Sequence, residues 1–110
     1  VTYSNDAKRS VLGVTEQTLK EYGAVSKQTV KEMAEGVRRN SGAQLVVTVS
    51  GIAGPGGGSE EKPVGTVWFG FLCGEHEVQI KQVFSGNRDE VRQHAISFAI
   101  NQLIKMLSEN

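Results

Sequence analysis

The stretch QLVVTVSGIAGPGGGSEEKPVGTVWFGFLC, residues 44–73, decides the fold because it joins two apolar segments through a loop dense in glycine. Five of the eight residues from Gly51 to Gly58 are glycine, and each loses much backbone entropy on folding. A folded domain keeps such a loop where the backbone adopts positive φ or comes very close to a neighbour. Otherwise the loop is only a mobile connection, so both interpretations stay open at this point.

The segments on either side of the glycine loop have the composition of β-strands. Residues 44–50 are apolar or β-branched at nearly every position, which predicts a central strand buried on both faces. Residues 64–73 are rich in Val, Trp and Phe and predict a second strand. The pair Gly74–Glu75 then turns the chain into residues 76–84, where apolar and polar residues alternate, so we expect a hairpin.

Helix caps mark the remaining segments. We expect a short helix ending near Leu12, a second short helix from the Thr15 cap to Gly23, a third from the Ser26 cap to about Arg39, and a final helix of roughly 20 residues after Asn87. Residues 1–4 resemble the end of a strand, so the chain is expected to start in the middle of a domain. The resulting order β-α-α-α-β-β-β-α predicts an α/β fold with a mixed sheet and helices packed on its faces.

The composition limits the class of protein. With 110 residues the chain fits one domain, and 12 basic residues balance 12 acidic ones. We therefore expect neither a nucleic-acid nor a membrane-surface partner, and no apolar run is long enough to span a membrane. The single cysteine, Cys73, is typical of a buried strand residue in a reducing cytoplasm.

Three clusters have residue types suited to binding or catalysis. The glycine loop could form an anion nest, although it matches neither phosphate-loop motif and leads into a strand instead of a helix. Tyr3 lies at a predicted strand end, and Lys8 lies one turn into the helix that follows. If Lys8 is desolvated, its amine can lose the proton and act as a base, whereas a solvated Lys8 has no such role; both interpretations stay open. Arg88 begins the last helix against the helix dipole, which suits either an anionic ligand or a pair with a neighbouring acid. His76 and His94 have no partners at metal-ligand spacing.

Three stretches together resemble one family. They read VTYSNDAKRSVLGV, VSGIAGPGGGSEEKPVGTVWFG and FSGNRDEVR, and the intervening LKEYGAVSKQTVKEMAEG is similar to the same family. The chain thus resembles the CinA C-terminal domain family, whose best-defined activity is deamidation of nicotinamide mononucleotide. The resemblance implies a three-layer α/β/α sandwich, a small-molecule nucleotide substrate, no metal and no organic cofactor. It also implies self-association, for which Trp68 or Phe71 would be exposed.

The resemblance assigns roles to individual residues. The family nucleophile is a serine in a Ser-Cys-Thr-Gly-Gly stretch that precedes VTYSN, and this sequence begins after that stretch, without the first strand and helix of the family domain. Lys8 would activate the serine, Tyr3 would assist it, and Ser50 would supply a nearby hydroxyl. The groups expected to bind the oxyanion and the phosphate are Gly51, Gly54, Gly56, Gly57, Arg88 and Arg92. Which of them binds which charge is left open, and Arg88 is the stronger candidate of the two arginines.

Two other classes of function remain as alternatives. One is a nucleotide-binding module of the same family that binds without catalysis. The other is a structural or partner-binding domain in which the glycine loop is only a mobile connection.

Overall fold

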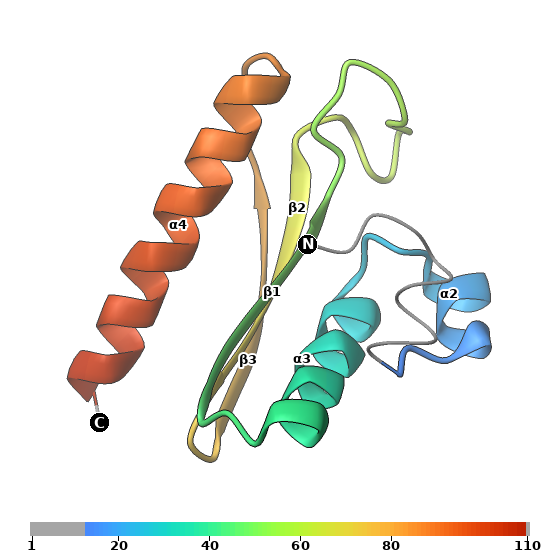
Figure 1. The fold of residues 1–110 in the computed structure, drawn as a ribbon. Coiled ribbons are helices and arrows are strands. Elements are labelled where there is room, and N and C mark those ends of the chain that lie inside the picture. The colour runs from blue at the N-terminus through green and yellow to red at the C-terminus, as the bar shows by residue number, and fades with distance from the viewer. Residues whose placement is uncertain (1–12, 110) are drawn as a thin grey trace.

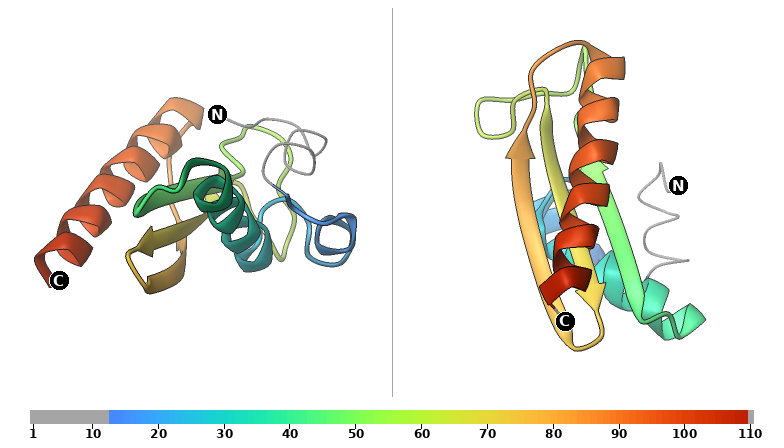
Figure 2. Two further views of the ribbon diagram at one scale, coloured as in Figure 1. Left: turned by 60° about the horizontal axis from the view of Figure 1, so that its bottom comes forward. Right: turned by 90° about the vertical axis from the view of Figure 1, so that its left-hand side faces the viewer.

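The computed structural model describes residues 13–109 and folds them into three layers (Figure 1). A sheet lies between one long helix on one face and a shorter helix on the other, and a second short helix packs against that shorter one (Figures 1 and 2). In chain order the elements are α2 (Glu16–Tyr22), α3 (Lys27–Ser41), β1 (Leu45–Gly51), β2 (Thr66–Cys73), β3 (His76–Val83) and α4 (Arg88–Glu109). The expected strand at residues 1–4 and helix before Leu12 lie outside the described residues.

The sheet has the order β1-β2-β3, so the expected hairpin is confirmed. Both pairings are antiparallel, with Ser50 opposite Trp68 and Cys73 opposite His76. The turn between β2 and β3 contains Gly74 at a φ of 60°, which glycine adopts without strain. The α/β class is confirmed. A mixed sheet also contains a parallel strand pair, and the three described strands form only antiparallel pairs.

The helix boundaries follow the capping residues closely. The Thr15 hydroxyl accepts a hydrogen bond from the Thr18 amide, and Gly23 ends α2. The Ser26 hydroxyl accepts from the Thr29 amide at the start of α3. That helix continues two residues beyond the expected end, because the left-handed cap falls on Gly42.

The larger core lies between β2 and α4. Phe69 and Phe71 are fully buried in it, and the Phe98 ring of α4 lies 4.7 Å from the Phe69 ring, centroid to centroid. The expectation that Phe71 is exposed for self-association is therefore wrong. Alternation along β2 points Phe71 toward α4, whereas the side chain of Trp68 points to the other face and is partly exposed.

The strand β1 differs from the expectation of burial on both faces. Exposed and buried residues alternate along it: Val46, Thr48 and Ser50 face α3 and are buried, while Val47 and Val49 are 38% and 43% exposed. The apolar composition of β1 is thus satisfied on only one side by the described residues. This half-covered strand carries the glycine loop at its end.

Candidate functional site

The glycine loop leaves the sheet in a defined way. The β1–β2 ladder extends past Gly51, because the Ile52 amide donates to the Thr66 carbonyl at 2.9 Å and the Gly65 amide donates to the Ile52 carbonyl at 2.6 Å. Gly65 in turn accepts a hydrogen bond from the Phe84 amide. The loop therefore begins and ends on one rung of the sheet, which fixes both of its ends.

Glycine is required at different positions of the loop for different structural reasons. A Cβ on Gly54 would lie 2.6 Å from a Val64 methyl, and a Cβ on Gly58 would lie 2.6 Å from the Val64 amide nitrogen. Gly57 has a φ of 94°, which side chains disfavour. Gly56 meets nothing within 4 Å. Gly54 and Gly58 are thus required because the loop packs closely against Val64 at its base, and not only because a ligand must come near.

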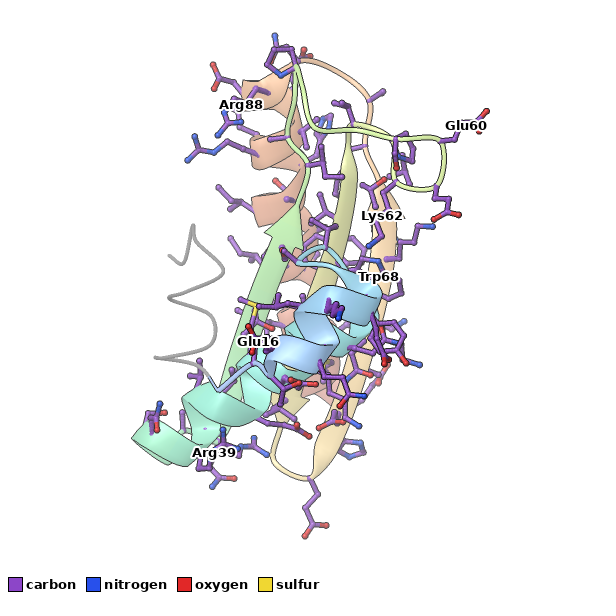
Figure 3. The ribbon with its side chains drawn as sticks, turned by 90° about the vertical axis from the view of Figure 1, so that its right-hand side faces the viewer. Glu16, Arg39, Glu60, Lys62, Trp68 and Arg88 are labelled. Carbon is purple, nitrogen blue, oxygen red and sulfur yellow. The ribbon has the colours of Figure 1, made fainter. Side chains whose placement is uncertain are left out.

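Arg88 connects the loop to α4. It is the first residue of that helix, as expected, and its Nη1 donates to the carbonyl of Gly54 at 3.0 Å. No carboxylate among residues 13–109 forms an ion pair with it, although Asp89 and Glu90 follow directly. Because one contact engages only one of the five guanidinium N–H donors, the others remain open to an anion beside the loop (Figure 3).

Arg92 lies one helical turn after Arg88 and is exposed. Residues four apart share a helix face, so the two arginines project from the same side of α4. That side continues into Ala95 and Ala99, which are buried against the sheet. Beyond the core, the same face of α4 therefore presents two positive charges at the end of the sheet that carries the loop.

Ser50 lies at the end of β1 and is 9% exposed. Its hydroxyl donates to the Ala24 carbonyl at 2.8 Å, in the connection between α2 and α3. The hydroxyl proton is therefore engaged, and only the oxygen lone pairs remain for another donor. Ser50 is adjacent in sequence to the glycine loop, and its side chain anchors the α2–α3 connection to the sheet.

Lys62 has a role that the sequence did not suggest. The three residues before it, Ser59, Glu60 and Glu61, are exposed at the rim of the loop. The Lys62 ammonium, however, donates to the carbonyl of Tyr22 at 2.6 Å and so links the loop to the end of α2. Figure 3 shows Lys62 below the loop and Arg88 apart from it, on the first turn of α4. No local pattern signals this contact, because its partner lies 40 residues earlier.

Tyr3 and Lys8 lie outside the described residues, so their roles stay predictions. The described part of the site consists of the glycine loop, Ser50 and the two arginines. In that part, the amides of Gly56, Gly57 and Gly58 donate no hydrogen bond to residues 13–109. These amides, together with the guanidinium N–H groups of Arg88 that do not bind the Gly54 carbonyl, are donors without acceptors among the described residues, which is the arrangement that an anionic ligand or a developing oxyanion requires.

A hollow of about 410 Å³ lies elsewhere on the α3 side of the sheet. Lys27, Lys62 and Trp68 are among its lining residues, and none of the predicted site residues lines it. Among residues 13–109 no three His, Cys, Asp or Glu side chains are grouped to hold a metal. The described helices include none with the length and apolarity to cross a membrane.

Comparison with known proteins gives the same family over almost the whole chain. The family model for the CinA C-terminal domain matches residues 1–107. A protein named nicotinamide-nucleotide amidohydrolase PncC from Enterobacter agglomerans is 55% identical over 111 residues, which cover 100% of this chain and 68% of the relative. The PncC protein of Escherichia coli K12 is 50% identical, with 100% and 67% covered. A CinA-like protein of Petrotoga mobilis is 50% identical over 107 residues, covering 97% of this chain but only 27% of the relative.

Solved structures agree with this assignment. A CinA superfamily protein from Klebsiella pneumoniae superposes with a TM-score of 0.94 at 37% identity, covering 100% of this chain and 69% of the other. The competence/damage-inducible protein CihA from Agrobacterium tumefaciens gives a TM-score of 0.91 at 44% identity, with 96% and 65% covered. The chain thus spans about two thirds of the length of the PncC relatives and about a quarter of the CinA-like relative.

Proposed function

Because the chain belongs to the CinA C-terminal domain family, we propose that it forms the larger part of an amidohydrolase that converts nicotinamide mononucleotide to nicotinic acid mononucleotide and ammonia. Such an enzyme recycles pyridine nucleotide. The observation that carries the proposal is the contact between the Arg88 guanidinium and the Gly54 carbonyl. It brings a cation suited to phosphate and a set of open backbone amides to one end of the sheet.

The substrate has two groups that these donors fit. Its phosphate carries negative charge in the ground state, whereas its carboxamide oxygen becomes negative only in the transition state. Arg88, with Arg92 one turn away, fits the phosphate, because a guanidinium binds phosphate through paired hydrogen bonds. The amides of Gly56 and Gly57 fit the oxyanion, since bare backbone allows close approach. The opposite assignment, in which Arg88 binds the oxyanion and the glycine amides bind the phosphate, is distinguished by the test of Arg88 below.

In the proposed reaction a serine from the family's Ser-Cys-Thr-Gly-Gly stretch attacks the carboxamide carbon. The Lys8 amine takes the hydroxyl proton as the C–O bond forms, then returns it to the departing nitrogen as the C–N bond breaks, which releases ammonia. Water then attacks the acyl-serine and gives one proton to Lys8, which passes it to the serine oxygen as the acyl C–O bond breaks. The product leaves as the carboxylic acid and loses its remaining proton to water. Tyr3 assists Lys8, and the Ser50 oxygen lies near the reacting groups.

The proposal includes three further features of the enzyme. Hydrolysis of an amide by a serine and a lysine moves only protons and an acyl group, so it requires neither a metal nor an organic cofactor. The enzyme acts in the cytoplasm, where its single thiol stays reduced, and it assembles as a homo-oligomer. Nucleic acid and membranes are not its partners.

A second candidate is a nucleotide-binding module without catalysis. The low coverage of the Petrotoga relative favours it, because there the matching domain is a minor part of a much longer protein. Such a module would bind nicotinamide mononucleotide through the same arginines and amides and release no ammonia.

The decisive experiment joins this chain to the third of the E. coli relative that lies outside the match and measures ammonia released from nicotinamide mononucleotide. We expect turnover, and we expect Lys8→Ala to abolish it because the serine then lacks a proton acceptor. Calorimetric binding of the nucleotide without turnover would favour the module instead. Full activity in Lys8→Ala would contradict the assigned base.

The role of Arg88 is separable by a second substrate, nicotinamide riboside, which lacks the phosphate. If Arg88 binds phosphate, Arg88→Ala raises the KM for the mononucleotide about 10- to 100-fold, as expected for one charge-assisted contact, and leaves riboside turnover unchanged. If it binds the oxyanion, kcat falls for both substrates. Lys105→Ala, an exposed cation on the same helix, is the matched control and should change neither. A variant indistinguishable from the control with both substrates would remove Arg88 from the site.

A further inference from the structure

The connection between α2 and α3 is bonded both to the glycine loop and to the end of β1. The Tyr22 carbonyl accepts a hydrogen bond from the Lys62 ammonium at 2.6 Å, and the Ala24 carbonyl accepts one from the Ser50 hydroxyl at 2.8 Å. The two acceptors are separated by a single residue of the chain. Lys62 of the loop and Ser50 of β1 are therefore held by the same short piece of backbone.

This piece of backbone is itself fixed by the start of α3. The carbonyl of Gly23, between the two acceptors, accepts hydrogen bonds from the Ser26 hydroxyl at 3.0 Å and from the Thr29 hydroxyl at 2.7 Å. Both donors are buried. A Cβ on Gly23 would lie 3.1 Å from the Lys62 nitrogen, so the lysine packs closely on this backbone. A hydrogen bond to so fixed an acceptor restrains the segment that carries the donor.

The glycine loop is restrained from outside at two places. In the described part of the chain, hydrogen bonds from other elements involve residues 53–62 only at Gly54, whose carbonyl accepts from Arg88 of α4, and at Lys62, which bonds to the end of α2. Residues 56–58, whose amides donate to none of the described residues, lie between these two places. The position of these amides thus depends on one restraint from each side of the sheet.

The surroundings of Lys62 include a second lysine that lacks such a bond. Lys62 is partly buried and lines the hollow of about 410 Å³ together with Tyr22 and Trp68. Figure 3 shows it between the loop and Trp68. Lys81 lines the same hollow from β3, is exposed, and forms no hydrogen bond or ion pair with residues 13–109. The two lysines therefore share charge and location and differ in the contact with Tyr22.

We propose that Lys62 is a positioning residue of the amidase: its bond to the Tyr22 carbonyl holds the amides of residues 56–58 at a fixed place relative to Ser50. This inference rests on the proposed function, in which these amides bind the developing oxyanion. Oxyanion donors must lie about 3 Å from the oxygen, and a displacement of about 1 Å can lower the rate about a hundredfold. Without the bond from Lys62, the end of the loop is free of α2, so the amides occupy a wider range of positions.

The test joins this chain to the unmatched third of the E. coli relative and measures ammonia released from nicotinamide mononucleotide. Lys62→Met keeps the length of the side chain and removes its donors. We expect kcat to fall about tenfold and KM to change less than about threefold, because Lys62 acts through the loop and does not touch the substrate. Lys62→Arg, which can donate to the same carbonyl, should restore most of kcat, and Lys81→Met should change neither constant.

If the glycine amides bind the phosphate instead of the oxyanion, Lys62→Met raises KM about tenfold and leaves kcat unchanged, because ground-state binding is then what the loop supplies. That result also supports a positioning role for Lys62, since in both cases the effect passes through the amides of residues 56–58.

A second readout separates this inference from the proposed function. Glu60 and Glu61 are exposed in the loop, so a glutamate-specific protease reports how often the loop opens. We expect cleavage there to be about tenfold faster in Lys62→Met than in Lys81→Met, with equal urea unfolding midpoints. If the unsubstituted protein releases no ammonia, the amidase proposal fails, and calorimetric binding of the nucleotide replaces turnover: Lys62→Met should then weaken binding about tenfold.

Two results would overturn the inference. Activity, nucleotide binding and cleavage in Lys62→Met that all match Lys81→Met would show that the bond to Tyr22 does not restrain the loop. A loss of activity that Lys62→Arg fails to restore, together with a lower unfolding midpoint in Lys62→Met, would assign Lys62 to the general stability of the domain instead.

Discussion

The two faces of the sheet are held in different ways. On the α3 face, buried hydroxyls bond across elements: the Thr48 hydroxyl donates to the Val30 carbonyl at 2.8 Å, and Thr29 donates to the Gly23 carbonyl at 2.7 Å. On the α4 face the core cluster consists of aliphatic and aromatic side chains together with the thiol of Cys73. Hydrogen bonds fix one geometry, whereas apolar contacts only require coverage. Hydrogen bonds thus fix the geometry of the α3 face. On the α4 face, some apolar side chains of β1 and α4 stay exposed to solvent.

Two ties reinforce the α3 face at its ends. Arg38 donates through three of its nitrogens to the carbonyls of Ala43, Gln44 and Gly74, so it joins the end of α3 to both the start of β1 and the β2–β3 turn. Glu32 accepts hydrogen bonds from the Thr15 amide and the Thr18 hydroxyl and so joins α2 to α3. At the end of the sheet that carries the glycine loop, Ser50 and Lys62 add two further hydrogen bonds, which join the sheet and the loop to the α2–α3 region.

The largest effect is expected from breaking the apolar face. Phe69 is fully buried and its ring contacts those of Phe71, Phe84 and Phe98. Phe69→Ala should lower the free energy of unfolding by about 3–5 kcal/mol, through lost transfer energy and a cavity. Urea unfolding followed by circular dichroism measures it. Val83→Ala, at an exposed position, should cost under about 0.5 kcal/mol. Equal losses in the two variants would contradict the assigned core.

A smaller effect is expected from disturbing the hydrogen-bonded face. A Cβ on Gly70 would lie 2.6 Å from both the Thr48 hydroxyl and the Val30 carbonyl, so Gly70→Ala must push α3 away from the sheet. The expected loss is about 1–3 kcal/mol, the usual range for overpacking. Gly56→Ala is the control, because nothing lies within 4 Å there and the change should be neutral or slightly stabilising. If Gly70→Ala were equally tolerated in urea unfolding, the close contact between α3 and β2 would be wrong.

Local interactions made much of the fold readable from the sequence. The caps at Thr15 and Ser26 and the Gly74 turn act within three to five residues, so a sequence pattern is sufficient to find them. Arg88 was predicted at the start of the last helix for the same reason. Alternation along residues 76–84 likewise predicted the second strand of the hairpin, which is β3. The family motifs added the candidate site, of which Tyr3 and Lys8 lie outside the described residues.

Composition by itself determined that β1 is an apolar strand followed by a glycine loop, but only the tertiary structure decided which of its faces is covered. The same holds for the contacts that shape the site: Arg88 meets Gly54 across 34 residues and Lys62 meets Tyr22 across 40. Hydrophobicity specifies that a side chain leaves water and not what it packs against. Long-range partners depend on the placement of whole elements, which no local pattern encodes.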